Sequence, residues 1–383
     1  MITSFKPHFL LDPEIIFLNH GSFGATPRPV FEEYQAWQRR LERQPVQFLG
    51  RDIIAYMAAS RQALADYLDA EAQDVVYFPN PTTAANVVAR SLPLQPGDEI
   101  LSTDHAYGAM DRTWRFVCKK NEAKHIPQPI PLPFTTPEDF VETFWQGVTP
   151  RTRVIFLDHL TSPTALTFPV EPIIAHARAE GILTIIDGAH APGQIPLNLA
   201  ELGADIYIGA CHKWLCAPKG SAFLYVRREI QPMLEPLIVS WGYENATYET
   251  GYTFVNHHEW QGTRDMAAFL ATPAAIRFQA EHNWTSVRAR CRELAAETRA
   301  RINALTGLPP ISPDEPCWFT QFFAARLPDE VDVEKLKTQL YNEYRIEVPV
   351  HCWNDIPLIR VSFQGYNTSE DADALINALK ILL

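Results

Sequence analysis

Apolar positions along the chain alternate between helical spacing and short, almost wholly apolar runs. Runs such as RVIFLD at 153–158 and ILTIID at 182–187 predict strands that are buried on both faces. Strands are expected over 74–78, 99–103, 153–158, 182–187, 205–210 and 221–226. Helical patterns lie between them, over about 81–90, 108–120 and 170–180. This alternation predicts an α/β chain with a largely parallel central sheet.

The pattern changes after about residue 262. Two long helical patterns, at roughly 265–282 and 284–304, precede a strand–helix–strand–strand–helix series. The members of that series are 317–327, 331–344, 345–350, 358–363 and 369–382. We therefore expect a large domain over 16–264 and a smaller α+β domain over 265–383, with residues 1–15 packing against the smaller one.

Amino-acid composition excludes several classes of binding partner. The chain has 383 residues and a net charge of −12, from 33 Lys and Arg against 45 Asp and Glu. An acidic chain without a basic block is a poor binder of nucleic acid or anionic membranes. No apolar run approaches the ~20 residues of a membrane helix, and no secretory signal is visible. The six cysteines lack paired spacing, which predicts reduced thiols and a cytoplasmic setting. The pair His257-His258 lacks the spacing of metal ligands, so no metal site is expected.

Two residues stand where ligands bind in open α/β sheets, at the carboxyl ends of predicted strands. Asp187 ends one buried strand and Lys213 follows the next. Alone, each has an ordinary interpretation, as a loop or cap aspartate and a surface lysine. Together they meet at one sheet edge. Pyridoxal phosphate chemistry requires such a pair, because a lysine must form an imine with the aldehyde and a carboxylate must keep the ring nitrogen protonated.

A phosphate site is also suggested by the sequence. Asn80 can cap a helix that Pro81 begins, so the N–H groups and hydroxyls of Thr82 and Thr83 would lie at the positive end of the helix dipole. A plain helix start, without any ligand, is the alternative. No G-x-G-x-x-G or Walker loop occurs, which counts against a dinucleotide or P-loop nucleotide enzyme.

The stretches DGAHAPG (187–193) and HKWLCAPKGSAFL (212–224) resemble the lysine region of class V aminotransferases. These are fold-type I pyridoxal-phosphate enzymes, which include the cysteine desulfurases, and the isopenicillin-N-epimerase-like branch is the most similar. The similarity extends to 17–27, 103–116, 158–170, 259–265 and 359–371. The resemblance implies a large domain with a mostly parallel sheet, a smaller C-terminal domain and pyridoxal 5′-phosphate as cofactor.

Roles at the cofactor follow from this resemblance. Lys213 resembles the Schiff-base lysine, and Asp187 resembles the partner of the pyridine nitrogen. His190 stands where many relatives have a glutamine that hydrogen-bonds the ring phenolate oxygen. His212 resembles a histidine that contacts the phosphate. In this family a histidine at the position of His105 stacks on the ring, although Tyr107 could supply that face instead.

Roles at the substrate are implied in the same way. Arg360, on a predicted strand, would bind the carboxylate of an amino-acid substrate, and an intramolecular ion pair is the alternative. Asn19 and His20, from the N-terminal segment, are expected to line the same pocket. Gly262-Thr263-Arg264 resembles the segment that relatives lend to the phosphate site of the neighbouring subunit. The resemblance therefore implies a homodimer.

Two departures put sulfur transfer in doubt. Desulfurases carry a nucleophilic cysteine on a flexible loop well before the substrate arginine, whereas Cys352 lies only a few residues before Arg360. Residues 159–162 also lack the asparagine that desulfurases place near the ring. The resemblance implies an enzyme acting at the α-carbon of an amino acid, with epimerisation or racemisation ahead of C–S β-elimination and transamination. A non-catalytic pyridoxal-phosphate-binding regulator is an alternative from another class.

Overall fold

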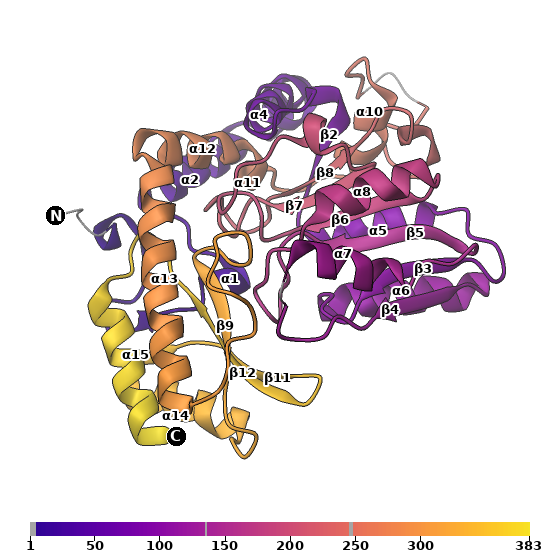
Figure 1. The fold of residues 1–383 in the computed structure, drawn as a ribbon. Coiled ribbons are helices and arrows are strands. Elements are labelled where there is room, and N and C mark those ends of the chain that lie inside the picture. The colour runs from indigo at the N-terminus through magenta and orange to yellow at the C-terminus, as the bar shows by residue number, and fades with distance from the viewer. Residues whose placement is uncertain (1–4, 135, 245–247) are drawn as a thin grey trace.

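The computed structural model describes residues 5–134, 136–244 and 248–383, and in these ranges the largest sheet has seven strands (Figure 1). Their order is β2-β8-β7-β6-β5-β3-β4. The strands span Val75–Phe78 (β2), Glu99–Thr103 (β3), Lys124–Gln128 (β4), Thr152–Asp158 (β5), Leu183–Gly188 (β6), Ile206–Ala210 (β7) and Ala222–Val226 (β8). The expected mostly parallel central sheet is confirmed, because β4, β3, β5, β6 and β7 pair in parallel.

Helices cover both faces of this sheet, which explains the continuous apolar runs of its strands. On one face, Val154, Phe156 and Ile185 join a hydrophobic core that includes the buried sides of α5 (Pro81–Ser91) and α6 (Gly108–Asn121). On the other face, Ile155, Leu157 and Ile186 join the main core of the protein. The other helices of these layers are α4 (Ile53–Leu68), α7 (Pro137–Trp145) and α8 (Val170–Ala179).

Two features of the sheet differ from the sequence prediction. The strand β8 runs antiparallel to both of its neighbours, β2 and β7, whereas the apolar pattern carries no information on direction. The edge strand β4 was not predicted. Its sequence KHIPQ contains a proline and has no apolar run, as suits an edge that pairs on one side only.

The C-terminal part forms a second layer beside the large sheet (Figure 1). Its antiparallel sheet has the order β11-β12-β9, from Val350–Trp353 (β11), Ile356–Ser362 (β12) and Phe322–Arg326 (β9). The predicted strand 345–350 is divided at Pro349. Its first half, β10 (Ile346–Glu347), pairs with the N-terminal strand β1 (Ile16–Phe17) instead. The helices here are α13 (Trp284–Thr306), α14 (Val333–Tyr344) and α15 (Ser369–Leu382).

The N-terminal segment contacts this C-terminal part. The amide of Phe5 donates to the carbonyl of Gly365 at 3.0 Å, and its ring lies 5.5 Å from that of Trp284. The long helix expected near 265–282 is two helices, because Pro273 begins a new one. Further helices are α2 (Arg28–Arg43), α10 (Thr253–Glu259), α11 (Ala267–Leu270) and α12 (Thr272–Glu281). Within the described ranges, no helix is both long and apolar enough for a bilayer.

Candidate active site

A cavity of about 210 Å³ lies where several strands of the large sheet end. Asp158 ends β5, Asp187 lies near the end of β6, and Lys213 follows β7. Thr82 reaches the cavity from the first turn of α5. The structure therefore brings together the lysine, the carboxylate and the helix start that the sequence singled out. The other lining residues are Ser22, Phe23, Asn80, Pro81, Tyr107, Met110, Ser162, Ala189, His190 and His212.

The surroundings of Lys213 lower the pKa of its amine and so raise the fraction that is neutral near pH 7. Its Nζ is 3.0 Å from Nε2 of His190. Burial lowers the pKa of Lys213 to about 8; the negative charge of Asp187 opposes this shift and the positive charge of Arg360 adds to it. A neutral amine is the form that reacts with an aldehyde and the form that accepts a proton.

The ring of His190 is fixed by its neighbours. The indole Nε1 of Trp214 donates to Nδ1 at 3.2 Å, and the ring of Phe322 stacks on it at 5.1 Å. Burial, followed by the charge of Lys213, holds the pKa of His190 well below its ordinary value. A neutral imidazole whose Nδ1 accepts must carry its proton on Nε2. His190 therefore presents an N–H donor toward Lys213 and the cavity.

Two carboxyl groups share the end of the sheet. Asp158 and Asp187 are register neighbours on parallel strands β5 and β6. One oxygen of Asp187 accepts the amide of Ala189 at 2.9 Å, and burial raises the pKa of Asp187. Burial and the charge of Asp187 raise the pKa of Asp158 well above its ordinary value. Sequence reasoning missed Asp158, although it ends the apolar run 153–158 in the way that Asp187 ends 182–187.

The two threonines of the predicted phosphate site have different surroundings: Thr83 is hydrogen-bonded within the helix cap, and Thr82 faces the cavity. The side chain of Asn80 accepts both the amide of Thr83 at 2.8 Å and its hydroxyl at 3.1 Å, so Thr83 serves the predicted cap. Thr82 lines the cavity and Thr83 does not. His212 lines it too, and its Nδ1 donates to the carbonyl of Ser221 at 2.9 Å. Burial lowers the pKa of His212 to about 4.

Arg360 is held by neutral groups and not by a carboxylate. From β12, its guanidinium donates to the carbonyl of Ser162 at 2.6 Å and to the hydroxyl of Ser22 at 3.0 Å. Among the described residues it has no ion-pair partner, and its Nε is buried without a hydrogen bond. The intramolecular ion pair left open by the sequence is therefore not found there. A buried cation without a counter-ion is suited to bind a ligand carboxylate.

A second cavity, of about 370 Å³, adjoins the first. Arg360 and His351 line it, and Tyr107 and Ser162 line both cavities. Tyr107 is 47% exposed and stands at the junction of the two cavities. This arrangement leaves room for the side chain of an amino acid whose carboxylate lies on Arg360.

The N-terminal segment supports the lysine loop from behind. Nε2 of His20 hydrogen-bonds the carbonyl of Lys213 at 3.1 Å, and His20 is fully buried outside the cavity lining. Asn19 also lies outside that lining, and its side chain accepts the hydroxyl of Ser22 at 2.5 Å. Gly24 has φ +69°, and a Cβ there would lie 2.0 Å from the carbonyl oxygen of His212. Only glycine permits this close approach.

His105 does not lie where the resemblance places it. It is fully buried, its Nδ1 is 2.7 Å from the hydroxyl of Thr164, and its Nε2 is 2.9 Å from the carbonyl of Ile130. Its ring packs against Trp353 at 4.2 Å and lies outside the cavity lining. A histidine whose two ring nitrogens are both satisfied in a core has a structural role. Tyr107, the alternative, is the residue that reaches the cavity.

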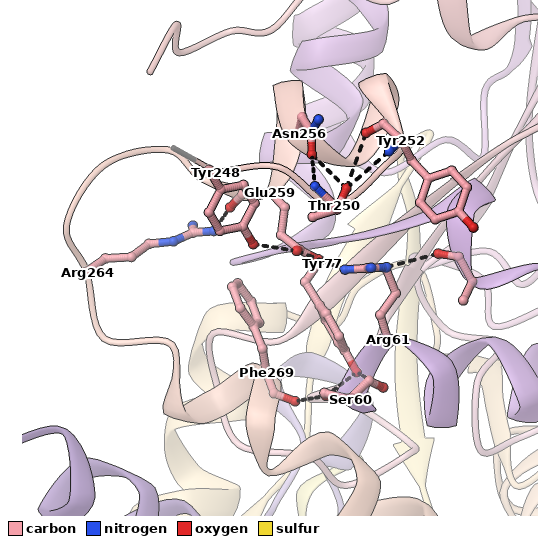
Figure 2. Close-up of polar contacts among 11 residues, drawn as sticks. Ser60, Arg61, Tyr77, Tyr248, Thr250, Tyr252, Asn256, Glu259, Arg264 and Phe269 are labelled. Carbon is pink, nitrogen blue, oxygen red and sulfur yellow. Dashed lines mark hydrogen bonds and ion pairs between the residues drawn. The ribbon is translucent and has the colours of Figure 1, made fainter. Parts of the chain in front are cut away.

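The segment that leads to Thr263 is anchored inside the molecule. Glu259, at the end of α10, accepts from Arg61 of α4 at 2.7 and 2.8 Å and from the hydroxyl of Tyr248 at 2.7 Å (Figure 2). Arg264 donates to the carbonyl of Glu259 at 3.1 Å. Thr263 itself is exposed and lies outside the cavity of its own chain.

Comparison with known proteins shows the family to which the chain belongs. The profile of the family Aminotransferase class-V matches residues 18–375. The chain belongs to this family. It is 39% identical to isopenicillin N epimerase of Amycolatopsis lactamdurans, over 97% of this chain and 96% of that protein. It is 27% identical to a probable chloroplastic L-cysteine desulfhydrase of Arabidopsis thaliana, over 97% and 84% of the two chains.

The fold is shared with solved structures. A mutant of C-DES with glycine covalently linked to its PLP cofactor has a TM-score of 0.84 and 20% identity, with 97% of each chain covered. The family and the fold expected from the sequence are thus confirmed. The chain's own residues also fit the expected cofactor, because an amine of lowered pKa, a strand-end carboxyl group and a capped helix start surround one cavity.

Proposed function

We propose that this protein is a pyridoxal-phosphate enzyme that acts at the α-carbon of an amino acid, most similar in function to the isopenicillin N epimerases. The observation that carries this proposal is the unpaired, buried Arg360 beside the cavity that holds Lys213 and Asp187. A lysine and a carboxylate alone would hold a cofactor. The guanidinium of Arg360 adds a group that can bind the carboxylate of an amino-acid substrate.

The cofactor-holding residues have separate tasks. When bound, pyridoxal phosphate supplies an aldehyde for the amino group and a ring that accepts the electron pair released at Cα. Lys213 would hold it covalently, and Asp187 would keep the ring nitrogen protonated. The Nε2–H of His190 would donate to the phenolate oxygen. Thr82, with the dipole of α5, would hold the phosphate. His212 would need its second proton to donate there, since its Nδ1–H is already committed to Ser221.

The substrate is positioned by the other end of the site. Arg360 would bind the α-carboxylate and so orient Cα toward the amine of Lys213, whose lowered pKa lets it remove and return the Cα proton near neutral pH. Epimerisation needs a second acid on the opposite face. With His105 turned into the core, Tyr107 is the candidate, because it lines both cavities and is half exposed.

A C–S β-lyase is the second candidate, supported by the desulfhydrase relatives, and transamination is the third outcome. Persulfide transfer has less support. Cys352 is exposed on the short hairpin of β11 and β12 and does not line the cavity. A regulator without turnover would keep Lys213 and the cofactor. The chain's similarity to an epimerase over 97% of its length supports an enzyme instead.

One experiment separates these outcomes. The holoenzyme is incubated in deuterated water with a panel of L-amino acids that includes cysteine and cystine. Deuterium at Cα with inverted configuration is the result expected for an epimerase, and pyruvate with ammonia would assign β-elimination. A 2-oxo acid with the aminated cofactor would assign transamination. No change with any amino acid, in a protein that shows the cofactor's visible absorbance, would favour the regulator.

The homodimer belongs to the same proposal. Figure 2 shows the Glu259 network that fixes the segment before Thr263. Thr263 itself is exposed, which suits a residue that completes the phosphate site of a second copy. Exposed apolar side chains gather in the preceding stretch, namely Leu237, Ile238, Val239, Trp241, Tyr243 and Tyr252. Light scattering should give twice the 43.4 kDa chain mass. A monomer that still binds the cofactor tightly would contradict this part. A cytoplasmic location stays a prediction.

A further inference from the structure

The cavity contains an ionisable group that the proposed chemistry does not use. Asp158 ends β5 and Asp187 lies one residue before the end of β6. The two strands are parallel and the two residues are paired in register, so their side chains leave the sheet on the same face. Neighbouring strands are about 4.8 Å apart, which places the two carboxyl groups side by side. Both residues line the cavity.

The partners of the two carboxyls differ. Asp187 accepts the amide of Ala189 at 2.9 Å, which favours its ionised form. Asp158 is 3% exposed, and among the described residues nothing hydrogen-bonds its Oδ2. The charged groups that act on it are Asp187 from β6 and Lys213 from the loop after β7. Backbone hydrogen bonds from Asp158 itself and from Tyr107, at the start of α6, reach its other oxygen and favour the ionised form, but burial and the charge of Asp187 outweigh them. The next residue, His159, bonds Tyr207 instead.

The charges do not balance if both acids are ionised. One ammonium, that of Lys213, faces two buried carboxyl groups, and a reacted lysine offers no more than one positive charge. Like charges at this separation in a buried site leave one proton on the pair. Both acids accept backbone amides on one oxygen, but the ammonium of Lys213 interacts more strongly with Asp187 than with Asp158, and Oδ2 of Asp158 is buried without a donor among the described residues, so the proton belongs on Asp158.

We propose that Asp158 is a second cofactor-contacting carboxyl group, which stays protonated and donates a hydrogen bond from Oδ2 to the cofactor bound against Asp187. This inference rests on the proposed function. It gives the unpartnered oxygen a partner and leaves a single negative charge, that of Asp187, at the pyridine nitrogen. Burial raises the pKa of Asp158 in the direction that this assignment requires.

The first test uses the cofactor-free protein. Infrared spectra should contain a carbonyl band of a buried, protonated carboxyl group, which shifts in deuterated water and is absent from Asp158→Asn. Asp205→Asn is the matched control, because Asp205 is also buried beside a strand of this sheet but forms an ion pair with Arg227 at 2.7 Å. That control should keep the band. A wild-type spectrum without it, or a band that Asp158→Asn keeps, would overturn the proposal.

The second test uses the holoenzyme. Asparagine keeps a donor at this position and matches the charge of a neutral acid, so Asp158→Asn should leave the pH midpoint of the cofactor's absorbance within about 0.3 units of wild type. If Asp158 were instead an ionised carboxylate about 6 Å from the titrating group of the cofactor, its removal in Asp158→Asn would shift that midpoint by about two pH units. Such a shift would overturn the proposal. Asp158→Leu, which lacks a donor, should weaken cofactor binding about tenfold.

The two proposals fail in different ways. A wild-type protein that binds no pyridoxal phosphate would contradict the proposed function. A wild-type protein that binds it, together with a two-unit shift in Asp158→Asn, would contradict only the protonated state of Asp158.

Discussion

The amine of Lys213 should react near neutral pH as if it belonged to a much weaker base than an ordinary lysine. Burial lowers its pKa to about 8 from 10.5, since the cavity solvates the ammonium poorly. Below this pKa the neutral fraction falls tenfold per pH unit. The reactivity of Lys213 in the cofactor-free enzyme should therefore rise with pH and level off above about pH 8.

The size of the effect follows from the two pKa values. At pH 7, a group with a pKa of 8 is about 9% neutral, whereas one with a pKa of 10.5 is about 0.03% neutral. The advantage is about 300-fold. Two substitutions should move the midpoint in opposite directions. Asp187→Asn removes the negative charge that raises the pKa, so the midpoint falls, and Arg360→Gln removes a positive charge, so it rises.

Trace labelling with acetic anhydride measures this pKa directly. The rate of acetylation at Lys213, followed by peptide mass spectrometry across pH 5–11, is proportional to the neutral fraction. A lysine side chain in a short unstructured peptide serves as the reference. Limited access to the cavity scales every rate equally and leaves the midpoint unchanged. A midpoint near that of the reference peptide, or an upward shift in Asp187→Asn, would refute the reasoning.

Three further predictions concern other buried polar groups of the protein. Glu259→Gln should lower the free energy of unfolding by about 3–5 kcal/mol, because it leaves the Arg61 guanidinium buried without its partner; chemical denaturation checks this, and a loss below about 1 kcal/mol would contradict it. Trp214→Phe should release the Nδ1 acceptor of His190, so nitrogen NMR of the cofactor-free protein should show a mixture of ring tautomers instead of Nε2–H alone. Arg360→Gln should raise the dissociation constant of amino acids about 10- to 100-fold in absorbance titrations of the holoenzyme, and an unchanged constant would argue against carboxylate binding.

Much of the fold could be predicted because the relevant interactions are local. The strand 99–103 and the helix start at Pro81 match the structure, and the Asn80 cap was predicted from its side chain alone. The antiparallel direction of β8 could not be, because direction depends on which neighbour a strand finds in space. The division of 345–350 at Pro349 depended likewise on β1, more than 300 residues earlier in the chain.

The candidate site, like the fold, was predicted from the sequence only in part. The sequence singled out Lys213, Asp187 and Thr82 because strand ends and helix starts in an α/β sheet are places where polar groups meet a ligand, and the structure brings these residues to one cavity. It also pointed to His105, which has the expected position along the chain but the wrong side-chain direction. Whether a ring faces a ligand or a core depends on the partners around it, here Thr164, Ile130 and Trp353.

The order of apolar and polar residues by itself determined an α/β protein with an amine and a carboxylate at one sheet edge, since backbone periodicity and strand ends are written in local sequence. Only the tertiary structure decided how each of these groups is charged. Among the described residues Arg360 has no ion-pair partner, His190 carries its proton on Nε2, and Asp158 lies beside Asp187. These arrangements arise because packing brings residues distant in the chain close together and removes water from between them. Burial and neighbouring charge set a proton's position, and neither exists until the chain has folded.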